Sequence, residues 1–162
     1  MTTPSHPSSA IKAILLIGLF AGTLDILAAF IQTYISSNVM PMAVLRYIAS
    51  GAVGMEAFKG GVPMALLGLL IHYCIATAWA LLFFLLYPKL SILSKNKYVV
   101  GLAYGIFIWA IMNLVVVPLT NVPKGGGIKF PGAFIGMGIL MVAMGLPIAM
   151  MVNKYYSSKY QG

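Results

Sequence analysis

The sequence predicts an all-α integral membrane protein, in which four transmembrane helices form a bundle and a short interfacial or re-entrant helix joins the first two. Hydrophobic residues make up 61% of the 162 residues and charged residues 7%, whereas roughly a quarter of a soluble domain is charged. Four apolar runs are long enough to cross about 30 Å of hydrocarbon at 1.5 Å per residue. The chain is also short enough to form one membrane domain, residues 1–162.

The first apolar run, residues 11–35, follows the polar leader "MTTPSHPSS". A cleavable signal peptide is the alternative interpretation. However, the run exceeds the usual apolar core of roughly 7–15 residues and carries Asp25 near its middle. We therefore expect a retained transmembrane helix.

The next segment, about 41–58, is moderately apolar but contains Arg46 and Glu56. The uncharged stretch between these two residues is far shorter than the roughly 20 residues that a span needs. An interfacial or partly re-entrant helix is therefore expected. The alternative is a fifth crossing, which would reverse the ends of every later helix.

Three further runs, about 62–87, 98–119 and 130–152, are expected to span. Turn residues fill "TNVPKGGGIKFPG" between the last two, which predicts a loop. Pro147 predicts a kink in the fourth helix. Cys74, within the second run, is expected to be a small buried side chain.

The basic residues flank the apolar runs, and their distribution predicts the orientation. No dense basic run or basic helix face is present, so nucleic acid is not an expected partner. Instead, the partners expected are the lipid bilayer and its anionic headgroups. Six basic residues against four favour both termini in the cytoplasm. The side of the termini has Lys12, Lys89, Lys95, Lys97, Lys154 and Lys159, and the other side has Arg46, Lys59, Lys124 and Lys129.

Small residues recur at helical spacing and predict the faces on which the helices pack. Because small side chains let backbones approach closely, such rows replace the hydrophobic attraction that lipid cannot supply. The rows are Gly18, Gly22, Asp25, Ala29 and Gln32 in the first helix, Gly68, His72, Ala76 and Ala80 in the second, Gly101, Gly105, Trp109 and Asn113 in the third, and Gly138, Gly145 and Ala149 in the fourth.

The polar side chains of the first three helices lie on these rows at similar depths. Asp25 lies about 21 Å from the cytoplasmic end of the first helix, and Asn113 lies about 22 Å from the cytoplasmic end of the third. His72 lies about 15 Å from the outer end of the second helix. We therefore expect Asp25, His72 and Asn113, with Gln32, to share one polar intramembrane site. Arg46 and Glu56 could cap it from the outer segment, although a headgroup-facing amphipathic helix is the plainer account of these residues.

Two interpretations of the polar site stay open. In one, Asp25 and His72 take up a proton or bind a cation or a polar solute. In the other, they hydrogen-bond across helices, or Asp25 stays neutral. No metal or cofactor is expected, because one imidazole and one carboxylate are too few for a structural zinc site. No catalytic motif is present, so an enzyme is not expected.

Three stretches carry a resemblance to a known family: "GLFAGTLDILAAF", "GLLIHYCIATAWALLFFLLYPKL" and "GLAYGIFIWAIMNLVVVPL". They resemble the YagU-type bacterial inner membrane proteins, whose pattern has an intramembrane histidine, a helix ending near "PK" and a Gly-x-x-x-Gly helix ending in proline. The resemblance covers residues 14–35 and 66–120. It implies a small polytopic inner-membrane protein and brings no established activity, and Asp25 is not part of the family pattern.

The expected function is that of a transporter or channel-like protein, or of a subunit of one, with a polar intramembrane site. The alternative is a structural or regulatory subunit of a larger membrane complex. Four helices leave little room for a gated path, so a homo-oligomer or a membrane-protein partner is expected. Exposed glycine rows would be the natural contacts.

Overall fold

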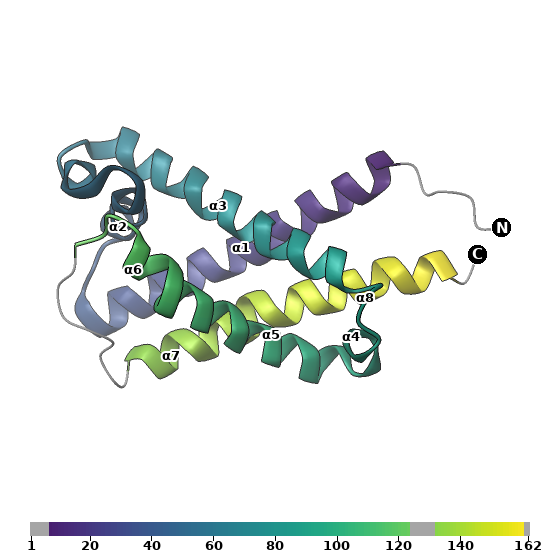
Figure 1. The fold of residues 1–162 in the computed structure, drawn as a ribbon. Helices are drawn as coiled ribbons and strands as arrows, with labels where there is room; N and C mark the ends of the chain where they lie inside the picture. Colours follow the sequence, from purple (N-terminus) through teal and green to yellow (C-terminus); the bar gives the residue numbers. More distant parts are fainter. Residues whose placement is uncertain (1–6, 124–131, 161–162) are drawn as a thin grey trace.

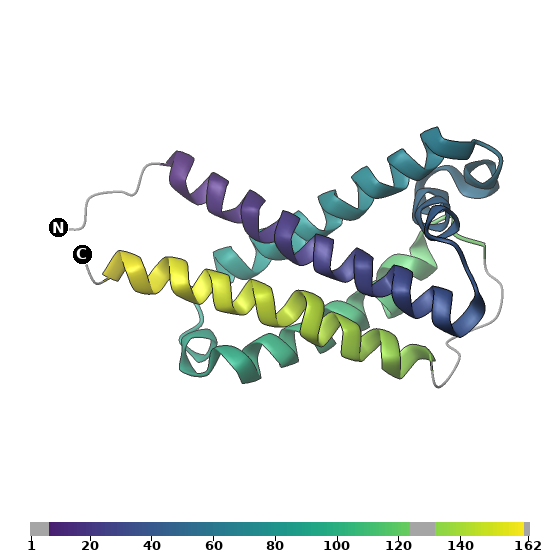
Figure 2. The same ribbon diagram turned by 180° about the vertical axis from the view of Figure 1, so that it is seen from behind.

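The computed structural model describes residues 7–123 and 132–160, and every regular element in these ranges is a helix (Figure 1). Four helices are long and apolar enough to cross a membrane: Ser9–Ser37, Gly61–Leu86, Lys97–Leu119 and Gly132–Ser158. The predicted all-α class with four spans is therefore confirmed, and the chain is a multi-pass membrane protein. The start of the first helix and the end of the last helix lie at the same end of the bundle, as Figures 1 and 2 show.

The helices divide into the following elements. They are α1 (Pro7–Ser37), α2 (Pro41–Val53), the 3₁₀ helix η1 (Gly54–Phe58), α3 (Gly61–Leu86), α4 (Ile92–Lys95), α5 (Lys97–Ile111), the π-helix η2 (Met112–Val116), α6 (Val117–Leu119), α7 (Gly132–Ile139), the π-helix η3 (Leu140–Gly145) and α8 (Leu146–Tyr160). Thus α5, η2 and α6 form the third span, and α7, η3 and α8 form the fourth.

The fourth span continues eight residues beyond the predicted end at 152, to Tyr160. Aromatic packing explains the extension. Tyr155 and Tyr156 pack against Phe84 of α3 with tilted rings, whose centroids lie 5.0 and 5.1 Å from that of Phe84. The Tyr156 hydroxyl donates to the Phe84 carbonyl at 3.2 Å. The predicted start of this span at 130 and most of the predicted loop lie outside the described residues.

Helix α2 occupies the segment for which an interfacial or re-entrant helix was expected. Its 13 residues reach only about 20 Å, which is too short for a crossing. It begins with Pro41 in the first turn and ends at Val53, and the next residue, Gly54, has a φ of 67° that suits glycine. A Cβ added at Gly68 of α3 would collide with the Leu45 carbonyl and lie 3.2 Å from the Ala49 nitrogen. The absence of a side chain at Gly68 therefore lets α2 lie directly on α3.

Glycines mark two more close helix crossings. A Cβ added at Gly18 of α1 would lie 2.6 Å from Thr77 Cα, and one at Gly22 would lie 2.9 Å from Ala76 Cβ, both on α3. Gly101 and Gly105 of α5 approach the backbone of the fourth span in the same way. The glycine rows are therefore used within the chain, and the prediction that they are exposed for a second copy is wrong.

One glycine of the fourth row behaves differently. A Cβ added at Gly138 would meet no atom within 4 Å, although Gly145 in the same row approaches α5 closely. The row therefore packs through its second half only.

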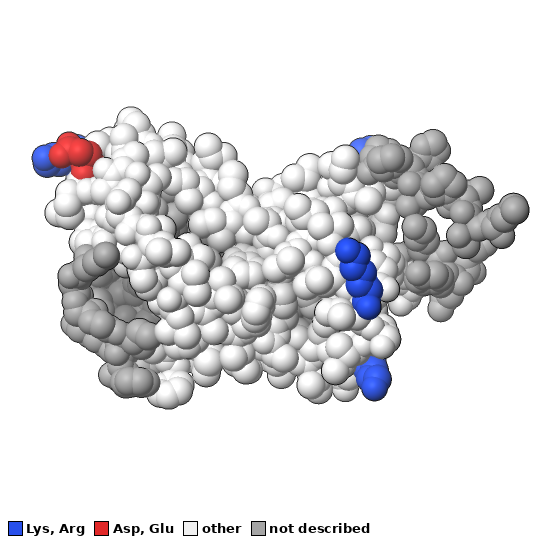
Figure 3. Space-filling view, viewed as in Figure 1, with Lys and Arg blue, Asp and Glu red and all other residues white. Residues whose placement is uncertain are grey.

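The outside of the bundle is apolar between two charged ends. On the face in Figure 3, charged side chains lie at the ends, with uncharged surface between them. Many large apolar residues, such as Leu16, Leu66 and Val99, are exposed, as lipid contact requires. Cys74 is also exposed, so the expectation of a buried cysteine is wrong. Its helix presents that side outward because Ala76 and Ala80 face the core.

Candidate functional site

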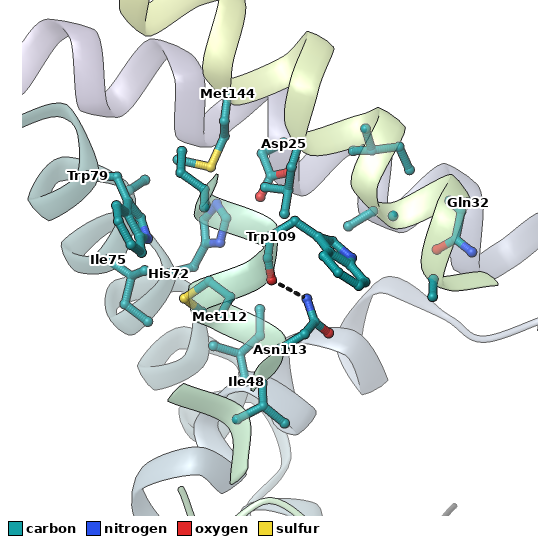
Figure 4. Close-up of a pocket in the computed structure, with 18 of the residues that line it drawn as sticks. Asp25, Gln32, Ile48, His72, Ile75, Trp79, Trp109, Met112, Asn113 and Met144 are labelled. Atoms are coloured by element: carbon teal, nitrogen blue, oxygen red, sulfur yellow. Dashed lines mark hydrogen bonds between the residues drawn. The ribbon is translucent and has the colours of Figure 1, made fainter. Parts of the chain in front are cut away.

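A cavity of about 570 Å³ lies among the four spans, in the half of the bundle that holds α2. It reaches from Gly132, at the start of α7, to Met144 in η3. Twelve residues separate these two positions, which corresponds to about 18 Å along the helix. The cavity is lined by all four polar residues that the sequence grouped: Asp25, Gln32, His72 and Asn113 (Figure 4).

The position of Asp25 follows from the glycines that precede it on the same face of α1. Gly18 and Gly22 hold α1 against α3. One turn beyond Gly22 the two helices have separated enough for Asp25 to face the cavity, and Ala29 and Gln32 continue its wall. The same row of residues thus packs tightly in one half of the bundle and lines a cavity in the other.

The Asp25 carboxylate has no hydrogen-bond partner within residues 7–123 and 132–160, and it is not fully buried. Its electrostatic neighbour is His72. The two side chains come from α1 and α3 and face the same space. The site therefore contains an acid whose oxygens are free to accept a hydrogen bond or to bind a positive charge.

His72 forms its hydrogen bond with the backbone of α1. The distance from His72 Nε2 to the Gly22 carbonyl oxygen is 2.8 Å. A carbonyl oxygen can only accept, so Nε2 is the donor. An Asp25–His72 hydrogen bond, one of the two structural interpretations, is therefore not what the structure shows. His72 joins α3 to α1 beside the acid.

Asn113 is held by its own helix. Its Nδ2 donates to the Trp109 carbonyl at 2.9 Å, the dashed line in Figure 4. Its Oδ1 has no partner among the described residues. This bond fixes the orientation of the Asn113 amide, which lines the cavity with Oδ1 as an acceptor.

Both π-helices line this cavity: η2 through Met112 and Asn113, and η3 through Leu140 and Met144. Pro118 is the second residue after the end of η2, and Pro147 is the second residue after the end of η3. Proline cannot donate to the carbonyl four residues back, which here lies within the π segment. Widened helical turns are common at functional sites. The proline spacing was visible in the sequence, but only the Pro147 kink was predicted from it.

Arg46 and Glu56, the predicted cap, do not line the cavity. Arg46 Nη1 donates to the Phe58 carbonyl at 3.1 Å and so ties α2 to η1. Glu56 accepts from Lys59 Nζ at 2.8 Å on the exposed surface. Their place at the cavity is taken by Tyr47 and Ile48 of α2.

Trp79 and Trp109 also line the cavity, and sequence reasoning did not assign them to the site. The spacing contained the signal, because Trp79 lies seven residues after His72 and Trp109 four residues before Asn113, on shared helix faces. Edge-to-face contacts with Tyr104 and Phe107, at 6.3 and 5.9 Å between ring centroids, hold Trp79 in place.

In the described part of the chain, no three side chains of the types His, Cys, Asp and Glu gather into a possible metal site. Comparison of the chain with protein-family models, with curated proteins and with solved structures found no match.

Proposed function

We propose that this protein is a transporter or a channel-like protein, or a subunit of one, and that the cavity around Asp25 is its solute site. The observation that carries the proposal is the Asp25 carboxylate, which faces the cavity without a hydrogen-bond partner in the described residues. Placing an ionisable group at the centre of a span costs about 2.5–3.5 kcal/mol on insertion scales, so such groups normally have a partner or a function.

The other polar groups have structural partners, and Asp25 differs from them. His72 is bonded to Gly22, and Asn113 to Trp109. A purely structural role for Asp25 would need a neutral carboxyl group or a donor from outside the described residues, such as one from another chain. That is the alternative function, a structural or regulatory subunit of a larger membrane complex, in which Asp25→Asn weakens assembly and leaves solute flux unchanged.

Flux measurements in reconstituted liposomes test the proposal. Proton and cation flux would be compared between the unmodified chain, Asp25→Asn and His72→Ala. Glu56→Gln is a matched control, because it neutralises the only other acid, which pairs with Lys59 on the surface away from the cavity. We expect Asp25→Asn to lose flux and Glu56→Gln to retain it. Equal flux in the unmodified chain, Asp25→Asn and His72→Ala would remove the transport assignment.

The proposed setting is a bacterial inner membrane with both termini in the cytoplasm and a relationship to the YagU-type proteins. The charge distribution supports the orientation, since the end that holds the termini is the more basic one. A homo-oligomer or a membrane-protein partner is part of the proposal, because four helices leave little room for a gated path. The start of α1, the turn from α3 through α4 to α5 and the last part of α8 lie at one end of the bundle, and α2 and η1 lie at the other (Figure 1). Of the described residues, the first group of segments contains Lys12, Lys89, Lys95, Lys97 and Lys154, and the second contains Arg46 and the adjoining Lys59.

A further inference from the structure

We infer that the cavity binds a monovalent organic cation with an apolar body, whose charge lies near Asp25 and whose body lies against Trp79 and Trp109. The inference rests on the proposed function in one respect, that the cavity is a ligand site. It adds the chemical class of the ligand.

The charged residues that line the cavity determine the charge of the ligand. Asp25 is the only acidic residue in the lining, and no lysine or arginine of the described chain contributes to it. His72 is the electrostatic neighbour of Asp25, but its Nε2 proton is directed to the Gly22 carbonyl and not to the carboxylate. In a low-dielectric site a carboxylate attracts a cation and repels an anion.

The remaining lining sets the shape and polarity of the ligand. It is mostly apolar, with Trp79, Trp109 and Tyr47 as its aromatic members. Tryptophan is the aromatic side chain that binds cations best through its ring face, and quaternary ammonium ligands are bound in this way. Met112 and Met144 add flexible apolar contacts. About 570 Å³ is within the range of small-molecule pockets, about 300–1,000 Å³.

A bare inorganic cation fits the lining less well. Calcium takes six to eight oxygen ligands and magnesium six. The side-chain carboxylate and amide oxygens in the lining come from Asp25, Gln32 and Asn113. Asp25 and Gln32 are seven residues apart on one helix, about 10 Å along its axis, so they cannot bind one ion together. An organic cation needs a single counter-charge and apolar contact area.

The chain carries its own probe of binding. Trp79 and Trp109 are its only two tryptophans, and both line the cavity. The intrinsic tryptophan fluorescence of the full chain therefore reports on this cavity. The purified protein in lipid nanodiscs would be titrated with tetraphenylphosphonium, with neutral triphenylphosphine oxide and with anionic tetraphenylborate. Empty nanodiscs measure partition of each probe into lipid.

We expect saturable binding of the phosphonium cation, and binding of the neutral and anionic probes at least about tenfold weaker, because each loses the contact with a charged partner. Asp25→Asn should weaken cation binding by about the same factor, and Glu56→Gln should leave it unchanged. The probe comparison on the unmodified chain needs no variant, so it decides the question even if Asp25→Asn does not fold.

Equal binding of the cationic and neutral probes, preference for the anion, or full cation affinity in Asp25→Asn would overturn the ligand class. The two proposals can fail separately. Asp25-dependent proton flux without phosphonium binding would retain the proposed function and remove the organic cation. Asp25-dependent phosphonium binding without any flux would retain the ligand class and remove transport.

Discussion

Replacement of Gly105 by alanine should separate the two helices that cross there. The added Cβ would lie 2.6 Å from the Met141 nitrogen and 2.7 Å from the Leu140 carbonyl oxygen, with Met141 Cα closer still. All three are backbone atoms, so no side-chain rotation relieves the clash. The separation from the Met141 nitrogen alone must widen from 2.6 Å to at least 3.4 Å, where ordinary contact begins. Overpacking of this kind costs about 1–3 kcal/mol.

Gly138→Ala supplies the matched control. It makes the same chemical change in a helix, and its new Cβ meets no atom within 4 Å. The gain in helix propensity, about 1 kcal/mol, is common to both variants. The difference in unfolding free energy between them therefore isolates the steric cost, and we expect Gly105→Ala to be the less stable by about 1–3 kcal/mol.

Reversible unfolding in mixed micelles of increasing SDS fraction, followed by circular dichroism, measures this difference. Gly138→Ala should be as stable as the unmodified chain or slightly more stable. If Gly105→Ala were equal to or more stable than Gly138→Ala, the close crossing of α5 and η3 would be refuted.

Three more outcomes are expected. Asn96→Ala should lower the unfolding free energy by about 1 kcal/mol, since its side chain caps α5 by accepting from two backbone amides at 3.0 and 3.3 Å; no change would argue against the cap. Tyr104→Phe should cost about 0.5–1.5 kcal/mol in the same assay, because its hydroxyl donates to a carbonyl of α3 at 2.7 Å. In a Cys74→Ala background, Lys12→Cys and Lys59→Cys should react with an impermeant maleimide from opposite sides of the membrane. We expect Lys12→Cys to react from the cytoplasm. Labelling of both variants from the same side would contradict four spans.

The features of the fold that depend on local sequence pattern were predictable. Hydropathy locates the spans because a run of about 20 apolar residues favours the membrane over water, whichever other helices it packs against. The inward side of α1 was also readable, since a periodicity of 3.6 places Gly18, Gly22 and Asp25 on one face without reference to other helices. The extension of the fourth helix was not readable, because it depends on contact between Tyr156 and Phe84, 72 residues apart.

The candidate site was also predictable only in part. The sequence indicated that Asp25, Gln32, His72 and Asn113 belong on inward faces, and the structure places all four around one cavity. It did not indicate which of them would have a partner. His72 bonds to a backbone carbonyl of α1, an atom that every residue carries and that no residue type identifies.

From the amino-acid sequence alone, composition and periodicity determined the membrane class, the four spans and the faces that pack. The tertiary structure decided where those faces touch and where they separate. On α1, Gly22 is in close contact with α3, whereas Asp25, three residues later, lines the cavity. The difference arises from the angle at which two helices cross. That angle is set by backbone contacts between segments distant in the chain, and no local pattern encodes it.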